Sequence, residues 1–196
     1  MRGYFQTKKR ICSKNMKIAL IGTHGTGKTT ISHSLISNLK KKGLDADFLG
    51  ELARKCPFPL NENTTKRSQI WIILNQIIKE IENEEKCSLL ICDRSVLDGY
   101  CYYLNKFGNL KEIEPLILKH LQTYDLIVKI PIRKGFLKKD KIRSVNKKFQ
   151  KDIDKIIDSL LKKFKIKIMR FKEKEITNEE IVKRIVRVIK QSHKNL

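Results

Sequence analysis

The stretch GTHGTGKT, residues 22–29, fits the spacing G-x-x-x-x-G-K-T. Glycines adopt backbone angles closed to other residues, so such a loop can turn its N–H groups inward around a phosphate. Lys28 would bring a cation to the β- and γ-phosphates, and the Thr29 hydroxyl is a hard oxygen ligand of the kind that Mg²⁺ prefers. The pattern predicts an ATP site with Mg²⁺. The loop residues expected to bind the nucleotide are Gly22, Thr23, His24, Gly25, Thr26, Gly27, Lys28, Thr29 and Thr30.

Asp93 is the second candidate for the metal, because it ends the apolar run SLLIC. An acidic residue at the end of a strand beside a phosphate-binding loop commonly meets Mg²⁺, often through water. Arg94 follows directly and could hold a phosphate with two N–H groups. The position also suits a surface aspartate that caps the next helix, but the neighbouring phosphate loop favours the metal.

Apolar strands that alternate with helices must position these residues. The pattern predicts an α/β fold with a five-stranded parallel sheet and helices on both faces. The strands are expected within 16–22, 45–50, 88–93, 125–132 and 163–171, the last near an edge because its lysines alternate outward. The helices are expected within 28–41, 64–85, 95–107, 111–123, 146–163 and 177–190.

The 196 residues suit one domain, which we place at 16–196. Residues 1–15 contain basic groups and no acids, and they lack the apolar stretch of a secretory signal. Two interpretations of this extension stay open. It is a loose, disordered tail, or it lies upstream of a true start at Met16.

The net charge of +22 allows a polyanionic partner, since basic surfaces bind nucleic acid through its phosphates. The lysines are spread along the chain without interleaved aromatics, so a lysine-coated surface is favoured over nucleic-acid binding. Five cysteines, an odd number without C-x-x-C, argue against disulfides or zinc and for a reducing cytoplasm. No apolar run approaches the roughly 20 residues of a membrane helix.

The chain resembles the small P-loop nucleoside and nucleotide kinases. Within them it is most similar to the group that contains the nicotinamide riboside kinase domain and related AAA domain ATP-binding proteins. The resemblance implies the P-loop nucleoside triphosphate hydrolase/kinase fold. It rests on 22–29, GELARKCPFPLNE at 50–62, QIWIILNQ at 69–76, CDRSVLDGYCYY at 92–103 and DKIRS at 140–144.

The resemblance implies transfer of the γ-phosphoryl group of ATP to a small acceptor, most simply a nucleoside or nucleotide. Glu51, after the second strand, is the implied base for the acceptor hydroxyl. Asp93 is the competing base, and the choice between them stays open. We assign Asp93 mainly to Mg²⁺ and Arg94 to the acceptor or the phosphates. The acceptor residues expected are Glu51, Arg54, Gln69, Gln76 and Arg94.

The helix within 64–85 is expected to border the acceptor pocket. A glutamine amide can read the edge of a base or of nicotinamide, and Gln69 and Gln76 share one face at a spacing of seven. The alternative is that both are ordinary solvated side chains. The isoleucines expected to face the core at helical spacing are Ile70, Ile73, Ile77 and Ile81.

Residues 133–145 correspond to a lid that would bring Arg133 and Arg143 over the phosphates. The related pattern has Asp-Gly where this chain has Asp140-Lys141, and the alternative is a solvated basic loop. The expected catalytic residues are then Lys28, Glu51, Asp93 and Arg143. The competing hypothesis is a nucleotide-dependent ATPase or regulatory protein that contacts nucleic acid. The oligomeric state cannot be derived from these patterns.

Overall fold

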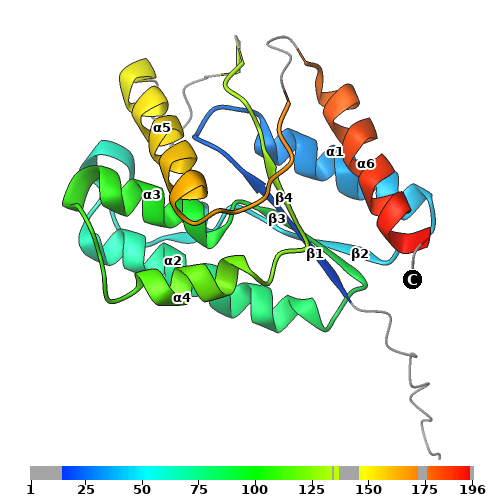
Figure 1. The fold of residues 1–196 in the computed structure, drawn as a ribbon, viewed down its shortest axis with the longest axis horizontal. Helices are drawn as coiled ribbons and strands as arrows, with labels where there is room; N and C mark the ends of the chain where they lie inside the picture. The colour runs from blue at the N-terminus through cyan, green and yellow to red at the C-terminus, as the bar shows by residue number, and fades with distance from the viewer. Residues whose placement is uncertain (1–14, 134, 137–145, 172–175, 195–196) are drawn as a thin grey trace, which may run out of the picture.

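A parallel sheet of four strands, in the order β2-β3-β1-β4, forms the centre of the protein (Figure 1). The computed structural model describes residues 15–133, 135–136, 146–171 and 176–194. The strands are β1 (Met16–Ile21), β2 (Ala46–Leu49), β3 (Leu89–Asp93) and β4 (Leu126–Lys129). Because β1 lies between β3 and β4, the loop that follows β1 comes next to the carboxyl end of β3.

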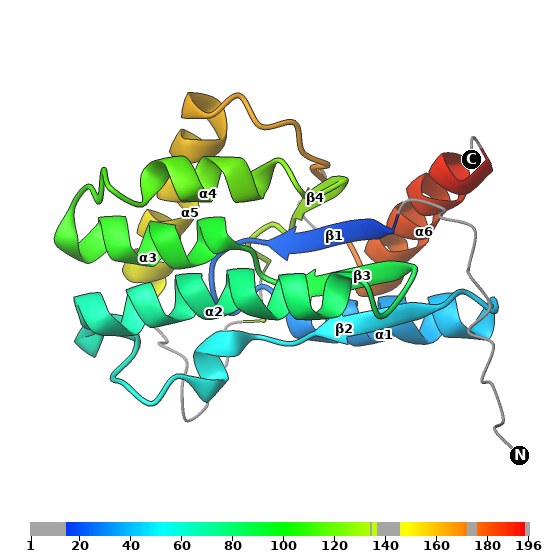
Figure 2. The ribbon, with the colours of Figure 1, turned by 90° about the horizontal axis from the view of Figure 1, so that it is seen from below.

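Helices cover both faces of the sheet, as predicted (Figures 1 and 2). One face packs against α1 (Lys28–Lys41) and α6 (Asn178–Lys194). The other face packs against α2 (Lys66–Glu84), α3 (Val96–Phe107), α4 (Glu114–Leu121) and α5 (Lys147–Lys163). Two short 3₁₀ helices, η1 (Leu52–Lys55) and η2 (Asn61–Asn63), connect β2 to α2.

The alternation of side chains along the central strands produces two separate cores. Ala19 and Ile21 of β1 face the core shared with α2 to α5, whereas Ile18 and Leu20 face the core shared with α1 and α6. All four side chains are fully buried. This explains why β1 is apolar without a break from Ile18 to Ile21, as is typical of a parallel strand covered on both faces.

The prediction of five strands is wrong by one. Within 163–171 only Met169 pairs with the sheet, through an isolated parallel bridge to Val128. Its amide donates to the Ile127 carbonyl at 2.8 Å, and its carbonyl accepts from the Lys129 amide at 3.0 Å. Because Lys165 turns the chain with a φ of 53°, few extended residues of this segment remain beside β4.

Capping bonds hold the first turns of two helices. Thr65 caps α2, accepting from the Ser68 amide while Ser68 returns a bond to the Thr65 amide. Before α6, the Glu180 carboxylate accepts from the Thr177 amide, and the Glu180 amide donates to the Thr177 hydroxyl. These bonds fix where the two helices begin.

The predicted inner face of α2 is partly wrong. Ile73 is buried, but Ile81 is 60% exposed, and Ile72 takes an inward position instead. The rotation of the helix follows from Glu80, whose fully buried carboxylate lies 3.1 Å from the ammonium of Lys17 and accepts from Tyr124 at 2.7 Å. A buried charge requires such partners, so Glu80 fixes the face that α2 turns inward.

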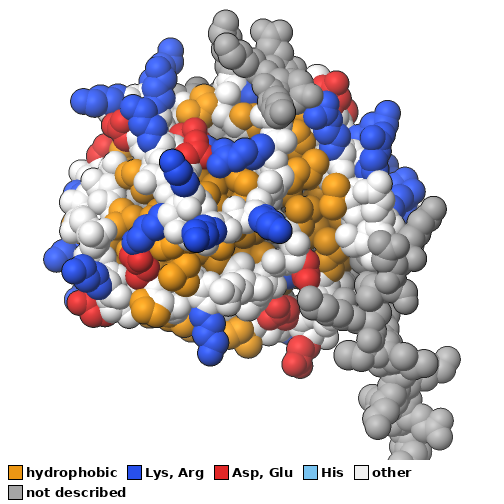
Figure 3. Space-filling view, viewed as in Figure 1, with side chains coloured by type: hydrophobic (Ala, Val, Ile, Leu, Met, Phe, Trp, Pro, Cys, Tyr) orange, Lys and Arg blue, Asp and Glu red, His pale blue; other side chains and the backbone are white. Residues whose placement is uncertain are grey.

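The surface carries the excess of basic groups. Figure 3 shows lysine and arginine side chains scattered over the face that it presents, with acidic side chains among them. None of the helices in the described part of the chain combines the length and apolar character that a membrane crossing requires.

Candidate active site

The predicted phosphate-binding loop lies between β1 and α1. Its glycines take positive φ angles, 142° at Gly22, 64° at Gly25 and 84° at Gly27. A Cβ at Gly22 would come 2.8 Å from the carbonyl oxygen of Ile130, and one at Gly27 would meet the side chains of Arg133 and Phe136 at the same distance. Both positions therefore require glycine for conformation and for space.

The ammonium group of Lys28 is folded into the loop. It donates to the carbonyl oxygens of Gly22 at 2.7 Å and Thr23 at 2.6 Å. Burial, with the nearby charge of Arg94, lowers the pKa of Lys28 to about 8. The remaining cavity, about 10 Å³, is lined by loop residues together with Glu51, Asp93 and Arg94. Lys28 must therefore leave these carbonyls for a phosphate to occupy the loop.

The other loop side chains have different surroundings. Thr30 is exposed, whereas Thr26 is buried and its hydroxyl donates to the Thr23 carbonyl at 3.2 Å. His24 is also buried, and its amide donates to the Tyr102 hydroxyl at 3.2 Å. These contacts attach the loop to α3 and close it from within.

Thr29 and Asp93 lie together at the predicted metal position. The Thr29 hydroxyl donates to Oδ2 of Asp93 at 2.6 Å, and Asp93 is 1% exposed. Burial raises the pKa of Asp93. A hydroxyl beside a carboxylate is a donor set that suits Mg²⁺. Among the described residues no group of three or more His, Cys, Asp or Glu could hold a metal, so these two donors would need phosphate or water oxygens as well.

Glu51 and Arg94 form a close ion pair next to the loop. Nε of Arg94 lies 2.7 Å from Oε1 of Glu51, and Nε of Arg54 lies 3.1 Å from Oε2. Arg54 itself is 39% exposed, so it holds the carboxylate from the solvent side. Arg94 takes a φ of 97°, which is rare outside glycine, and such a conformation persists only where surrounding contacts hold it.

Asp98 and Gln76 supply two of those contacts. The Asp98 carboxylate accepts from the amide of Ser95, the N-cap of α3, and from the Gly22 amide at 3.1 Å. It also lies 3.6 Å from Nη1 of Arg94. Gln76 is buried and donates to Oε1 of Glu80 at 2.7 Å and to the Arg94 carbonyl at 3.4 Å. The S-x-x-D spacing of Ser95 and Asp98 was a readable capping signal. Nothing in the sequence indicated its bond to the loop.

A second cavity, of about 40 Å³, opens beside the ion pair. Glu51 and Arg94 line both this cavity and the one inside the phosphate loop. Gln69 also lines it, with its amide donating to the Thr64 hydroxyl at 2.7 Å, whereas Arg54 and Gln76 are not among its described lining residues. The complete lining is His24, Glu51, Ala53, Leu60, Asn61, Gln69, Ile72, Arg94, Gly99 and Tyr102.

Arg133, one of the two arginines expected in a lid, is instead buried beside the phosphate loop. Arg133 is 6% exposed and donates to the carbonyl oxygens of Thr26 at 2.8 Å and Ile176 at 3.1 Å. Its guanidinium also lies 3.9 Å from the centre of the Phe136 ring. Arg133 therefore ties the phosphate loop to the start of α6, a role that the sequence did not indicate. Arg143 lies outside the described residues.

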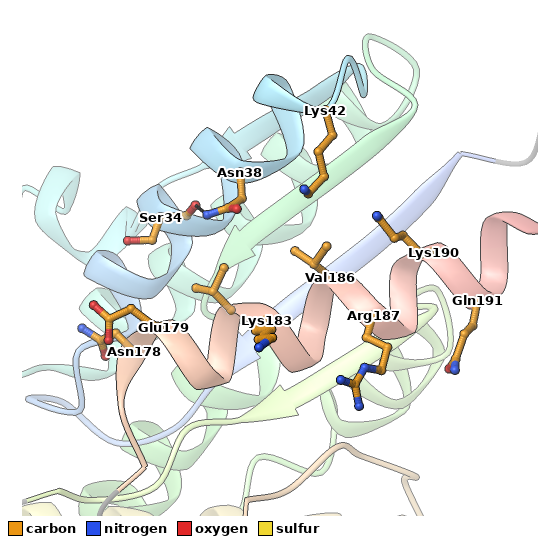
Figure 4. Close-up of a pocket in the computed structure, with 11 residues that line it drawn as sticks. Ser34, Asn38, Lys42, Asn178, Glu179, Lys183, Val186, Arg187, Lys190 and Gln191 are labelled. Atoms are coloured by element: carbon orange, nitrogen blue, oxygen red, sulfur yellow. Dashed lines mark hydrogen bonds between the residues drawn. The ribbon is translucent and has the colours of Figure 1, made fainter.

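A larger groove of about 780 Å³ runs between α1 and α6. Figure 4 shows Lys42, which caps the C-terminal end of α1, and Lys190 of α6 facing it. Val182 and Val186 contribute apolar lining. None of the residues predicted for the site lines this groove, so its size does not make it the active site.

Comparisons with known proteins concern the fold that carries this site. A family model described as the AAA domain matches residues 17–178. No curated protein matches the sequence. Deoxyadenosine kinase from M. mycoides with bound dATP is similar in structure, with a TM-score of 0.61, 19% identity, and coverage of 90% of this chain and 100% of that chain.

NadR protein in complex with NR is also similar, with a TM-score of 0.68 and 18% identity. That match covers 87% of this chain and 50% of the NadR chain. NadR in complex with NAD and AMP-PNP gives a TM-score of 0.66 at 18% identity, over 87% of this chain and 48% of that chain. The chain thus spans about half the length of NadR, and at these identities the matches show a shared fold.

Proposed function

Since the chain belongs to the AAA domain family and has the fold of P-loop nucleoside kinases, we propose that it is an ATP- and Mg²⁺-dependent phosphotransferase. The acceptor in this proposal is the hydroxyl group of a nucleoside or nucleotide. The observation that carries it is the shared wall of the two cavities. Glu51 and Arg94 line both the phosphate loop cavity and the pocket beside it.

Each side chain has a distinct part in the proposed reaction. Glu51, held by Arg94 and Arg54, accepts the proton of the acceptor hydroxyl as that oxygen attacks the γ-phosphorus. The bond from the γ-phosphorus to the bridging oxygen breaks, and ADP leaves with that oxygen. Lys28 moves from the loop carbonyls to the phosphate oxygens and stabilises their charge. Thr29 and Asp93 would hold Mg²⁺, which when bound neutralises charge on the phosphates.

Asp93 is less suited to the role of base. Its carboxylate accepts from Thr29 and it lines the loop cavity, while the acceptor pocket is lined by Glu51 instead. A base must come within hydrogen-bond reach of the proton that it takes. This arrangement favours Glu51 as the base and Asp93 as the metal ligand.

The acceptor pocket supports a nucleoside. Its polar groups include the Gln69 amide, and the Tyr102 ring is an aromatic surface on which a base could stack. Of the two similar proteins, deoxyadenosine kinase is described with bound dATP and NadR in complex with NR. At about 40 Å³ the pocket is smaller than a nucleoside, so its lining residues must move apart as an acceptor enters.

The direct test offers the protein ATP, Mg²⁺ and a panel of nucleosides and nucleoside monophosphates. We expect ADP and a phosphorylated product in equal amounts with at least one acceptor, identified by its mass. ADP formation that needs no acceptor and is stimulated by DNA or RNA would overturn the proposal and favour the nucleic-acid-dependent ATPase.

A further inference from the structure

One side of α2 exposes a row of large apolar side chains. Leu74 is 39% exposed, Ile78 49% and Ile81 60%. Half-buried Trp71 continues the row, and the spacings of three and four residues place all four on one side of the helix. Of the four large apolar side chains that are exposed in the described residues, three are in this row. Such a continuous patch marks an interaction surface.

Opposite charges stand at the two ends of this outer face of α2, defined by Trp71, Leu74, Ile78 and Ile81. Arg67 and Glu85 are 18 residues apart, which at 3.6 residues per turn is about five turns. Both are exposed and lie in line with the apolar row. Within the part of the chain that the structure describes, neither forms an ion pair, although Arg67 lies over the Phe58 ring.

The sequence of this face is symmetric about position 76. Arg67 and Glu85 are each nine residues from this position, Trp71 and Ile81 are each five residues from it, and Leu74 and Ile78 are each two residues from it.

We propose that two copies of the chain form a dimer in which their α2 helices pack antiparallel about a two-fold axis near this position. Leu74 then meets the partner's Ile78, Trp71 meets the partner's Ile81, and Arg67 meets the partner's Glu85. A two-fold interface needs this self-complementarity, because each residue must match its symmetry mate.

Charge also favours a second copy at this face. With a net charge of +22, two chains repel each other across most of their surfaces. When the C-cap residue Glu85 is counted with α2, the exposed and half-buried charged side chains are balanced, with Lys66, Arg67 and Lys79 against Glu82, Glu84 and Glu85. The pairing leaves the proposed acceptor pocket open, because Gln69 and Ile72 reach that pocket from the buried side of the helix.

Sedimentation velocity of the full chain, from about 1 to about 200 µM, tests the dimer. We expect the dimer fraction to rise with concentration. Glu85→Arg and Arg67→Glu, each alone, should weaken dimerisation at least about tenfold, because like charges then meet at both ends of the interface. The double variant with both changes should restore it. Each change also favours the dipole of α2, so loss of the dimer cannot be ascribed to a weakened helix.

Leu116→Gln on α4, where the side chain is 42% exposed, is the matched control and should leave the dimer unchanged. Ile78→Gln should weaken the dimer while thermal melting shows an intact fold. A chain that stays monomeric at every concentration overturns the proposal. A dimer that is insensitive to the single charge changes, or that the double variant fails to restore, overturns the antiparallel arrangement.

Discussion

The hydroxyl of Thr29 donates a hydrogen bond of 2.6 Å to the carboxylate of Asp93, which joins the first turn of α1 to the end of β3. The contact follows from the sheet. Asp93 is paired in register with Leu20 of the neighbouring parallel strand, and α1 begins just after that strand. Two residues that are 64 positions apart are thereby held within hydrogen-bond distance, as the proposed Mg²⁺ site requires.

Removing either donor should raise the Mg²⁺ concentration needed for activity. For Asp93→Asn and Thr29→Val we expect the half-maximal Mg²⁺ concentration to rise about 10- to 100-fold. Changes to the residues that surround a metal site commonly weaken metal affinity by this factor. A Mg²⁺ titration of ADP formation at saturating ATP measures the change. Asp47→Asn, at an exposed aspartate of β2 outside the site, is the control and should behave like the wild type. An unchanged Mg²⁺ requirement in Asp93→Asn would remove this residue from the metal site.

Lys28→Ala should lose about 100- to 1,000-fold in kcat, equivalent to about 2.7–4 kcal/mol of transition-state stabilisation. The reason is that a preorganised cation at the transferring phosphoryl group disappears. The measurement is ADP release under saturating ATP with the best acceptor. Lys41→Ala, an exposed lysine in the last turn of the same helix, should retain activity. Turnover at the wild-type rate in Lys28→Ala would refute the assignment of the loop.

Glu51→Gln should separate binding from chemistry. The amide keeps the size of the side chain but cannot take a proton, so phosphoryl transfer should fall about 10²- to 10⁴-fold while ATP affinity changes little. Titration calorimetry gives the affinity, and single-turnover kinetics give the transfer rate. Glu112→Gln, at an exposed acid, serves as the comparison. If transfer in Glu51→Gln is unchanged, the base is Asp93 or the reaction uses none.

The parts of the site that could be predicted from the sequence are those set by local spacing and by sheet order. The glycine pattern at 22–29 predicts a loop with backbone angles closed to other residues, and Gly22, Gly25 and Gly27 have positive φ angles. The meeting of Thr29 with Asp93 follows from the rule that the carboxyl ends of neighbouring parallel strands share an edge. The alternation of apolar strands and helices likewise predicted the layered fold, apart from the fifth strand.

The remaining contacts depend on long-range packing that no spacing encodes. Gln76 and Gln69 share one face of an ideal helix, yet only Gln69 lines the acceptor pocket, because Glu80 sets the rotation of α2 and draws Gln76 into its hydrogen bonds. The basic stretch around Arg133 predicts a lid residue over the phosphates, yet Arg133 is buried and donates to the carbonyl of Thr26. In both cases a distant residue decides the direction of the side chain.

Nucleotide binding should become weaker as the pH rises above about 8, the pKa to which burial lowers the Lys28 ammonium. A bound phosphate favours the protonated amine and so raises its pKa again. Binding above this pH must then take up a proton, and the affinity should fall by up to about tenfold per pH unit. Below this pH Lys28 is already charged, so it adds little pH dependence to the affinity.

Titration calorimetry in two buffers of different ionisation enthalpy counts the protons taken up on binding. We expect close to one proton taken up at about pH 9 and few at about pH 7. In Lys28→Arg the guanidinium stays charged, so the uptake should vanish. If the binding heat of the wild type at about pH 9 is the same in both buffers, no proton is taken up. Lys28 would then not become protonated as it moves from the loop carbonyls to the phosphates.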